Sequence, residues 1–350
     1  FDTESVDACV TDPPYGLSFM GKGWDHGVPG APYWQAVLRV LKPGAHLIAF
    51  GGTRTFHRLT CAIEDTGFEI RDCLMWLYGA GFPKSLDVSK AIDKAAGAKR
   101  EVLGYDSSQG HYDGSTRQSG RKLGRATFAQ DAYSLQMTRD TPITDPSTPN
   151  AKRWQGWGTA LKPAWEPIIL ARKPLSERNV AANVLQHGTG ALNVDATRIG
   201  TSKNIPASPS GKQGYRKGWT GERAGTSGFD PNVGRWPANV VLDEEAGVLL
   251  DAQSGELSSG SAVLGHEPSS PSKNTYGTFG RVAGQVYHDT GGASRFFYVA
   301  KASRSERGDG NDHPTVKPLA LLRWLVTLIT PPGGVVLDPF LGSGTPALAC

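Results

Sequence analysis

Short apolar runs that stop abruptly at proline or glycine constrain the fold of this chain more than any other feature. Residues 6–11 (VDACVT) stop at Asp12-Pro13-Pro14, and residues 45–50 (AHLIAF) stop at Gly51-Gly52. Such runs are typical of strands that are buried on both faces, as in parallel sheets, and proline cannot continue a central strand. The sequence therefore predicts an α/β fold in which buried strands alternate with helices.

The alternation of strands and helices continues after these two runs and returns near the other end of the chain. Helices are predicted at 33–41, 53–66 and 317–330, and further strands at 68–78, 165–171, 295–301 and 335–337. Lys42-Pro43-Gly44 is expected to end the first helix. Residues 98–153 and 175–294 are rich in turn-forming residues and show little periodicity. We therefore expect an α/β core at both ends of the sequence, with a large irregular insertion between them.

Positive charge is concentrated in one region. Residues 150–225 hold twelve Lys and Arg side chains against four Asp and Glu, a local net charge of +8, whereas the whole chain has +4. Aromatic residues are interleaved with these cations, namely Trp154, Trp157, Trp165, Tyr215 and Trp219. Because phosphates attract cations and aromatic rings can stack on bases, the pattern favours a polyanion-binding surface; a solvated basic face is the alternative.

Composition excludes several classes of protein. Hydrophobic residues make up 38% of the chain, which is enough for a core and argues against wholesale disorder. No run approaches the ~18 apolar residues that a membrane span needs, and residues 1–11 lack the basic start of a signal peptide. The four cysteines show no CxxC pairing. We therefore expect a reduced, cytoplasmic protein without a membrane segment, structural zinc or another metal.

The segment Asp12-Pro13-Pro14-Tyr15 presents hydrogen-bond acceptors where open α/β sheets bind ligands, at the carboxyl end of a buried strand. Neither proline has a backbone N–H, so the Asp12 carboxylate and nearby carbonyls remain. These acceptors suit a substrate NH2 group, because accepting both N–H bonds favours a pyramidal nitrogen with a free lone pair. Tyr15 can stack on a base rotated out of its helix. The alternative is a purely structural role, a tight turn in which Asp12 caps the next element.

Three motifs in this order resemble those of β-class amino-group DNA methyltransferases. Residues 6–16 (VDACVTDPPYG) are similar to the catalytic motif, and residues 313–318 (HPTVKP) and 337–345 (LDPFLGSGT) resemble the cofactor motifs. The resemblance covers about 1–98, 161–174 and 295–350. It implies a Rossmann-like, S-adenosylmethionine-dependent methyltransferase sheet with a circularly permuted motif order and a large irregular insertion.

The resemblance also implies roles for individual residues. Asp12 and the Pro13 carbonyl would hold the target amino group, Pro14 completes the catalytic motif, and Tyr15 would stack on the base. Lys317, with the Thr315 hydroxyl, is expected to contact the methionine carboxylate of the cofactor. The expected S-adenosylmethionine-binding residues are Asp338, Pro339, Phe340, Gly342, Ser343, Gly344, Thr315, Lys317 and His313.

The expected partner is double-stranded DNA, because sequence readout needs a surface of its own and the insertion is basic. The expected DNA-binding residues are Lys212, Tyr215, Arg216, Lys217 and Trp219. The oligomeric state stays open, with a homodimer as one option. We divide the chain into a catalytic half (1–98), an irregular insertion (99–160), a core strand (161–174), a target-recognition region (175–294) and a cofactor-binding half (295–350).

The chain departs from the family pattern at its ends. It begins almost at the catalytic strand, and it stops a few residues after Gly344, before the acid that would bind the cofactor ribose. We therefore expect a sequence truncated at both ends. A truncated fragment that binds DNA without turnover is one alternative function.

Other chemistries fit the motifs less well or stay open. The family resemblance implies adenine N6 rather than cytosine N4 as the target, because the catalytic motif begins with Asp12 rather than serine. Residues 342–347 (GSGTPA) fit the glycine pattern of a dinucleotide-dependent oxidoreductase, but that reading leaves the first motif unexplained. Methylation at cytosine C5 needs a cysteine nucleophile, usually after proline, and no cysteine here follows proline. An RNA or protein-glutamine substrate remains an alternative.

Overall fold

The computed structural model describes residues 1–17, 25–79, 81, 85–106, 141–199, 234–258, 290–300, 316–342 and 344–350. Within these residues, seven strands form one mixed sheet in the order β10-β7-β3-β6-β2-β1-β11. Its strands are β1 (Val6–Thr11), β2 (Leu41–Phe50), β3 (Glu69–Leu77), β6 (Trp165–Arg172), β7 (Val240–Asp243), β10 (Tyr298–Ala300) and β11 (Val336–Leu337). Two separate antiparallel pairs are β4 (Glu101–Asp106) with β5 (Thr141–Asp145), and β8 (Leu257–Ser258) with β9 (Thr290–Gly291).

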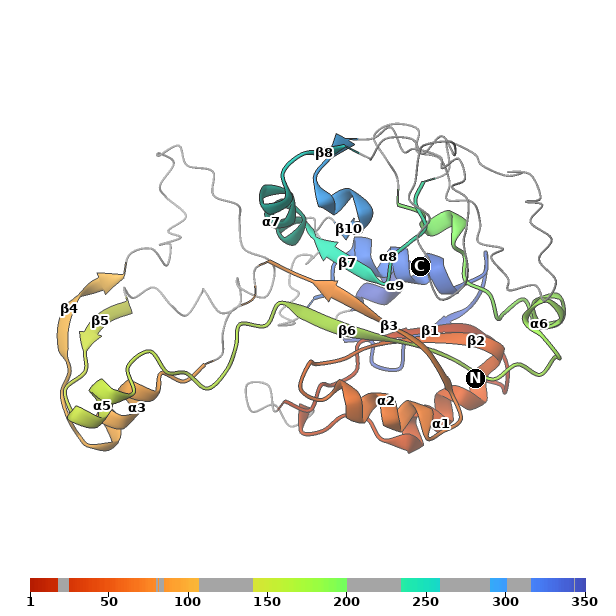
Figure 1. The fold of residues 1–350 in the computed structure, drawn as a ribbon. Coiled ribbons are helices and arrows are strands. Elements are labelled where there is room, and N and C mark those ends of the chain that lie inside the picture. The colour runs from red at the N-terminus through yellow and green to blue at the C-terminus, as the bar shows by residue number, and fades with distance from the viewer. Residues whose placement is uncertain are drawn as a thin grey trace, which may run out of the picture.

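Helices cover both faces of the large sheet. The helices of the described residues are α1 (Ala31–Val40), α2 (Phe56–Glu64), α3 (Val88–Ala95), α5 (Pro149–Arg153), α6 (Val180–His187), α7 (Glu244–Ser254), α8 (Leu319–Ile329) and α9 (Thr345–Ala349), of which α3 and α5 lie away from the large sheet (Figure 1). Helices α1 and α2 pack on one face, and α8 packs on the other (Figure 1). Within the described ranges, no helix is long and apolar enough to cross a membrane.

Two hydrophobic layers explain why the central strands are mostly apolar. In β1, Ala8 and Val10 pack in the layer that contains α8, whereas Cys9 packs in the layer that contains Trp34 of α1. Successive side chains of a strand point to opposite faces, so a strand covered on both faces buries apolar residues at consecutive positions. The predicted strands at 6–11 and 165–171 are confirmed for this reason.

The direction of the strands gathers loop residues at one edge of the sheet. Strand β1 is parallel to β2 and β11, and β3 is parallel to β7, which is parallel to β10. Strand β6 is antiparallel to both of its neighbours, β2 and β3. The carboxyl ends of six strands therefore meet the amino end of β6 at a single edge, which is where α/β sheets of this kind bind ligands.

The expected irregularity of residues 98–153 is wrong where the structure describes them, because that stretch contains β4, β5 and α5. Residues 175–294 likewise hold α6 and α7, where we expected only turns and short segments. Local signals for these helices exist in the sequence: Asn179, Asp243 and Thr148 each cap a helix by accepting a backbone N–H three residues on. The helices are short, so their propensity alone is weak.

The first helix ends at Val40, just before Lys42-Pro43-Gly44 as expected, and the chain passes directly into β2 at Leu41, so that these three residues lie inside the strand. Side chains from α6 and from the residues just after it donate hydrogen bonds to the backbone here. The Pro43 carbonyl accepts from Asn183 Nδ2 at 2.9 Å and from Thr189 Oγ1 at 2.6 Å. Gly44 has φ +78°, and a Cβ there would collide with the Asn183 amide. Tertiary contacts therefore hold the proline and the glycine within this strand.

We expect His46 to make the stability of the fold dependent on pH. This β2 side chain is 4% exposed, and burial, with the charges of Arg172 and Arg71, lowers its pKa from 6.5 to about 4. Below pH ~6.5, His46 therefore binds a proton in the unfolded chain but not in the folded chain. The free energy of unfolding falls as the pH falls from ~6.5 towards ~4. Between about pH 7 and pH 5, the free energy of unfolding should fall by about 2 kcal/mol from this residue.

Denaturant unfolding of the unaltered chain and of His46→Gln at both pH values measures this contribution. The variant lacks the titrating group, so its stability should change less over the same interval. Equal pH dependence in the two proteins would show that His46 does not resist protonation in the fold.

Candidate active site

Four polar side chains from distant parts of the chain meet at the carboxyl edge of the sheet. Asp12 and Tyr15 follow β1, Glu166 lies at the start of β6, and Lys317 precedes α8. The Lys317 ammonium is 2.9 Å from Asp12 Oδ2, 3.2 Å from Glu166 Oε2 and 3.0 Å from the Tyr15 hydroxyl. The Tyr15 hydroxyl is 2.9 Å from a carboxylate oxygen of both Asp12 and Glu166. We call these four residues the acid–lysine cluster.

Burial and charge set the ionisation of this cluster. The Lys317 side chain is only 8% exposed. Burial alone lowers the pKa of Lys317, but Asp12 and Glu166 outweigh it and hold the pKa well above its ordinary value. Burial, followed by the same two carboxylates, raises the pKa of Tyr15. At neutral pH, Lys317 is therefore a cation between two acids, and the Tyr15 phenol keeps its proton.

The position of Tyr15 depends on the loop after β2. Thr55, the N-cap residue of α2, uses its hydroxyl to donate to the Tyr15 carbonyl at 2.6 Å rather than to cap the helix. A Cβ at Gly52 would lie 3.2 Å from the Tyr15 ring, closer than most real contacts. Gly51-Gly52 thus ends β2 and also leaves space for the aromatic ring.

The predicted motif at residues 337–345 begins at the end of β11, the strand adjacent to β1. Thr11 Oγ1 donates to Asp338 Oδ1 at 2.5 Å, and the Phe340 backbone N–H donates to the same oxygen at 3.1 Å. Asp338 Oδ2 is buried and has no hydrogen-bond partner among the described residues. Burial raises the pKa of Asp338. An unpaired buried acceptor costs free energy unless a ligand supplies a donor, so Asp338 is a candidate ligand contact.

An apolar groove of about 450 Å³ lies beside this motif. It is lined by Leu337, Pro339 and Phe340 from the strand end and by residues of α1, including Tyr33. The rings of Phe340 and Tyr33 have centroids 6.0 Å apart. A groove of this size and lining suits a flat, mostly apolar group.

The structure brings most of the predicted site residues to the same edge. Asp12, Pro13, Pro14 and Tyr15 follow β1, and Asp338, Pro339, Phe340, Gly342 and Gly344 follow β11. Lys317 was expected beside the cofactor, and its ammonium contacts Asp12. The remaining predicted residues lie outside the described part of the chain: Lys212, Tyr215, Arg216, Lys217, Trp219, His313, Thr315 and Ser343.

Glu166 is the cluster member that the sequence analysis missed. Its only signal was an acid near the start of the apolar run 165–171. That position lies at the carboxyl edge only because β6 is antiparallel to its neighbours. The sequence alone did not indicate this strand direction.

Comparison with known proteins identifies the class to which this fold and site belong. The family model described as DNA methylase (N6_N4_Mtase) matches residues 6–350. The chain therefore belongs to the N6/N4 DNA methylase family, the amino-methyltransferases, and the predicted family is confirmed.

The individual relatives share only a small part of their sequence with this chain. Type II methyltransferase M.HindIII of Haemophilus influenzae is 24% identical over 235 residues, which cover 55% of this chain and 60% of that protein. This chain thus spans less than two thirds of that relative. The crystal structures of M1.HpyAVI and of the M1.HpyAVI–SAM complex are each 13% identical, with TM-scores of 0.35 and 0.34. Each alignment covers 99% of this chain, and 76% and 78% of those chains.

Proposed function

We propose that this chain transfers a methyl group from S-adenosylmethionine to the N6 amino group of adenine in duplex DNA. One contact carries the proposal: the hydrogen bond between Thr11 and Asp338, residues 327 positions apart. It joins the strand that ends in the acceptor-rich Asp12 motif to the strand that ends in the glycine-rich motif. A group bound by Asp338 would therefore lie next to one bound by Asp12, as a transfer between two ligands requires.

The residues after β11 fit the cofactor. Asp338 Oδ2, which has no partner among the described residues, can accept from an ammonium or hydroxyl group, and the groove beside Phe340 can take a flat ring. Gly342 and Gly344 have φ of +53° and +77°, so the chain turns tightly there and can approach a ligand closely. Thr315, His313, Ser343 and Pro339 are proposed to complete the site. When bound, S-adenosylmethionine supplies the electrophilic methyl group.

The acid–lysine cluster is proposed to hold and orient the target amino group. The Asp12 carboxylate and the Pro13 carbonyl accept its two N–H bonds, which favours a free lone pair on the nitrogen. Lys317 keeps Asp12 in place through the 2.9 Å contact and balances its charge. Tyr15 offers its ring to the base.

The proposal extends to the arrangement of the chain. The acceptor motif precedes the cofactor motif, so the motif order is permuted, and residues 175–294 are proposed to recognise the target sequence. Lys212, Tyr215, Arg216, Lys217 and Trp219 are the proposed DNA contacts there, because they combine cations with aromatic rings.

Analysis of methylated nucleosides tests the proposal. Duplex DNA of mixed sequence is incubated with the protein and methyl-labelled S-adenosylmethionine, digested and separated. We expect label in N6-methyl-2′-deoxyadenosine. Label in N4-methylcytosine would keep the family's chemistry but overturn the choice of base. Binding of DNA without any label would favour a non-catalytic DNA-binding protein.

A further inference from the structure

A small unit projects from the large sheet between β3 and β6. It consists of α3 and β4 (within residues 85–106) and of β5 and α5 (within residues 141–160), and we call it the arm (Figure 1). We propose that the exposed end of α5, with Lys152, Arg153, Trp154 and Trp157, binds the phosphate backbone of duplex DNA. This inference rests on the proposed function and adds a DNA contact distinct from the expected one at 212–219.

The arm begins beside the candidate active site. The two chain segments that form its base are paired: the Tyr78 N–H donates to the Ala164 carbonyl at 3.0 Å, and the Val88 N–H donates to the Trp157 carbonyl at 3.1 Å. The second segment then enters β6 at Trp165, one residue before Glu166 of the acid–lysine cluster. DNA that delivers a base to this cluster must therefore lie against the edge from which the arm projects.

The surface at the end of α5 is basic and unusually aromatic. From Pro146 to Trp165 the chain has three cations and no acid. Lys152 and Arg153 are exposed, and neither has a carboxylate within ion-pair distance among the described residues. Trp154 is 38% and Trp157 is 59% exposed, with ring centroids 4.9 Å apart in a T-shaped pair. Exposed aromatic pairs flanked by cations are more typical of binding surfaces than of solvated faces.

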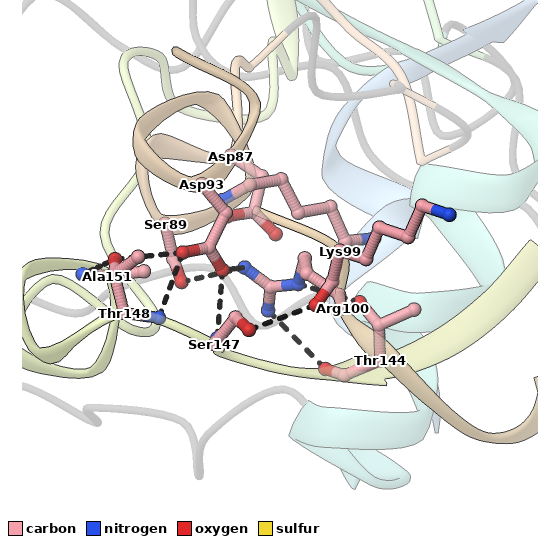
Figure 2. A network of polar contacts seen from close by, with 10 residues as sticks. Asp87, Ser89, Asp93, Lys99, Arg100, Thr144, Ser147, Thr148 and Ala151 are labelled. Atoms are coloured by element: carbon pink, nitrogen blue, oxygen red, sulfur yellow. Dashed lines mark hydrogen bonds and ion pairs between the residues drawn. The ribbon is translucent and has the colours of Figure 1, made fainter. Parts of the chain in front are cut away.

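A buried network of polar contacts holds this surface in place and keeps the nearby Asp93 carboxylate buried, away from the basic surface (Figure 2). Asp93 of α3 is 1% exposed and pairs with Arg100 at 3.0 Å. Its other oxygen accepts from the hydroxyl of Thr148 at 2.7 Å and from the Thr148 backbone N–H at 3.0 Å. Thr148 in turn caps α5 through the Ala151 N–H. The negative charge of Asp93 is therefore used internally to fix α5 on α3, while Lys152 and Arg153 face solvent.

The salt dependence of DNA binding measures this contact directly. Each phosphate contact contributes about 0.9 to the slope of log affinity against log salt concentration. Loss of two contacts in Lys152→Ala/Arg153→Ala should therefore reduce the slope by about 1.8, so that the affinity lost between ~50 and ~200 mM salt shrinks by about tenfold. The probe is a fluorescently labelled duplex of mixed sequence, read by anisotropy, because backbone contacts need no recognition sequence.

The matched control is Lys42→Ala/Arg71→Ala, which also removes two cations. Lys42 lies at the start of β2 and Arg71 near the start of β3, so both are at the opposite edge of the sheet from the site. We expect its salt slope to equal that of the unaltered protein. Lys152→Glu/Arg153→Glu should weaken binding further than the alanine variant, which tests the charge itself.

An unchanged slope in Lys152→Ala/Arg153→Ala, with normal methyl transfer, would overturn the arm assignment and leave the proposed function intact. Loss of affinity for RNA but not for duplex DNA would also overturn it, because the surface would then be an RNA site. If the unaltered chain neither binds duplex DNA nor methylates it, both the arm assignment and the proposed function are wrong.

Discussion

Replacement of Asp12 by alanine should lower the turnover of methyl transfer by about 30- to 1000-fold, equivalent to ~2–4 kcal/mol of barrier. The carboxylate is proposed to act on the amino group as its lone pair attacks, so its loss should reduce kcat more than the binding of DNA or cofactor. The fold should survive, because Lys317 keeps Glu166 as an ion partner at 3.2 Å. Single-turnover methylation of DNA and separate binding measurements check both parts.

The matched control for this experiment is Asp65→Ala, which removes an exposed carboxylate at the C-terminal end of α2, outside the proposed site. Its turnover should be normal. Near-normal turnover in Asp12→Ala would show that this carboxylate does not participate in the reaction. A fall in DNA affinity as large as the fall in kcat would mean that Asp12 acts in binding rather than in the chemical step.

Replacement of Lys317 by methionine should destabilise the fold by about 3–5 kcal/mol, because it leaves Asp12 and Glu166 facing each other without a cation. Because the pKa of Lys317 is raised, its ion pairs are fully present at neutral pH. They are lost only when the pH rises through the raised pKa of Lys317. In the variant, the folded state gains stability when it takes up a proton on a carboxylate. The difference in the free energy of unfolding between the unaltered protein and the variant should therefore shrink as the pH falls.

Denaturant unfolding of Lys317→Met at several pH values tests this expectation. Adding Glu166→Gln removes one of the two like charges and should restore much of the stability at neutral pH. Lys42→Met is the comparison, because Lys42 pairs with Asp7 at 2.6 Å but is 30% exposed, so it should cost only about 1 kcal/mol. Similar losses in the two single variants would contradict the buried, doubly paired state of Lys317.

Much of the α/β core could be predicted from short stretches of sequence. The prolines after Thr11 stop β1, and the mostly apolar composition of 6–11 and 165–171 indicates strands covered on both faces. Helix α8 was expected because Lys317-Pro318 precedes a long apolar run. These features depend on backbone restriction and on burial, which act within a few residues.

The arm was missed for the opposite reason. Helices α3 and α5 are short, and the carboxylate of Asp93 joins them through Thr148, 55 residues further along the chain. A helix of five or eight residues is marginal in isolation, so a window of sequence shows little of it. Its stability comes from a partner that the window does not contain.

The candidate site shows the same division. The chemistry of Asp12-Pro13-Pro14-Tyr15 and of residues 337–345 is local, since acceptors, prolines and glycines act through their own backbone and side chains. Which side chains meet depends instead on the order and direction of the strands. Lys317 reaches Asp12 across 305 residues, and Glu166 joins them because β6 runs antiparallel to its neighbours. Strand order and direction follow from how the whole core packs, and no short stretch of the chain encodes that packing.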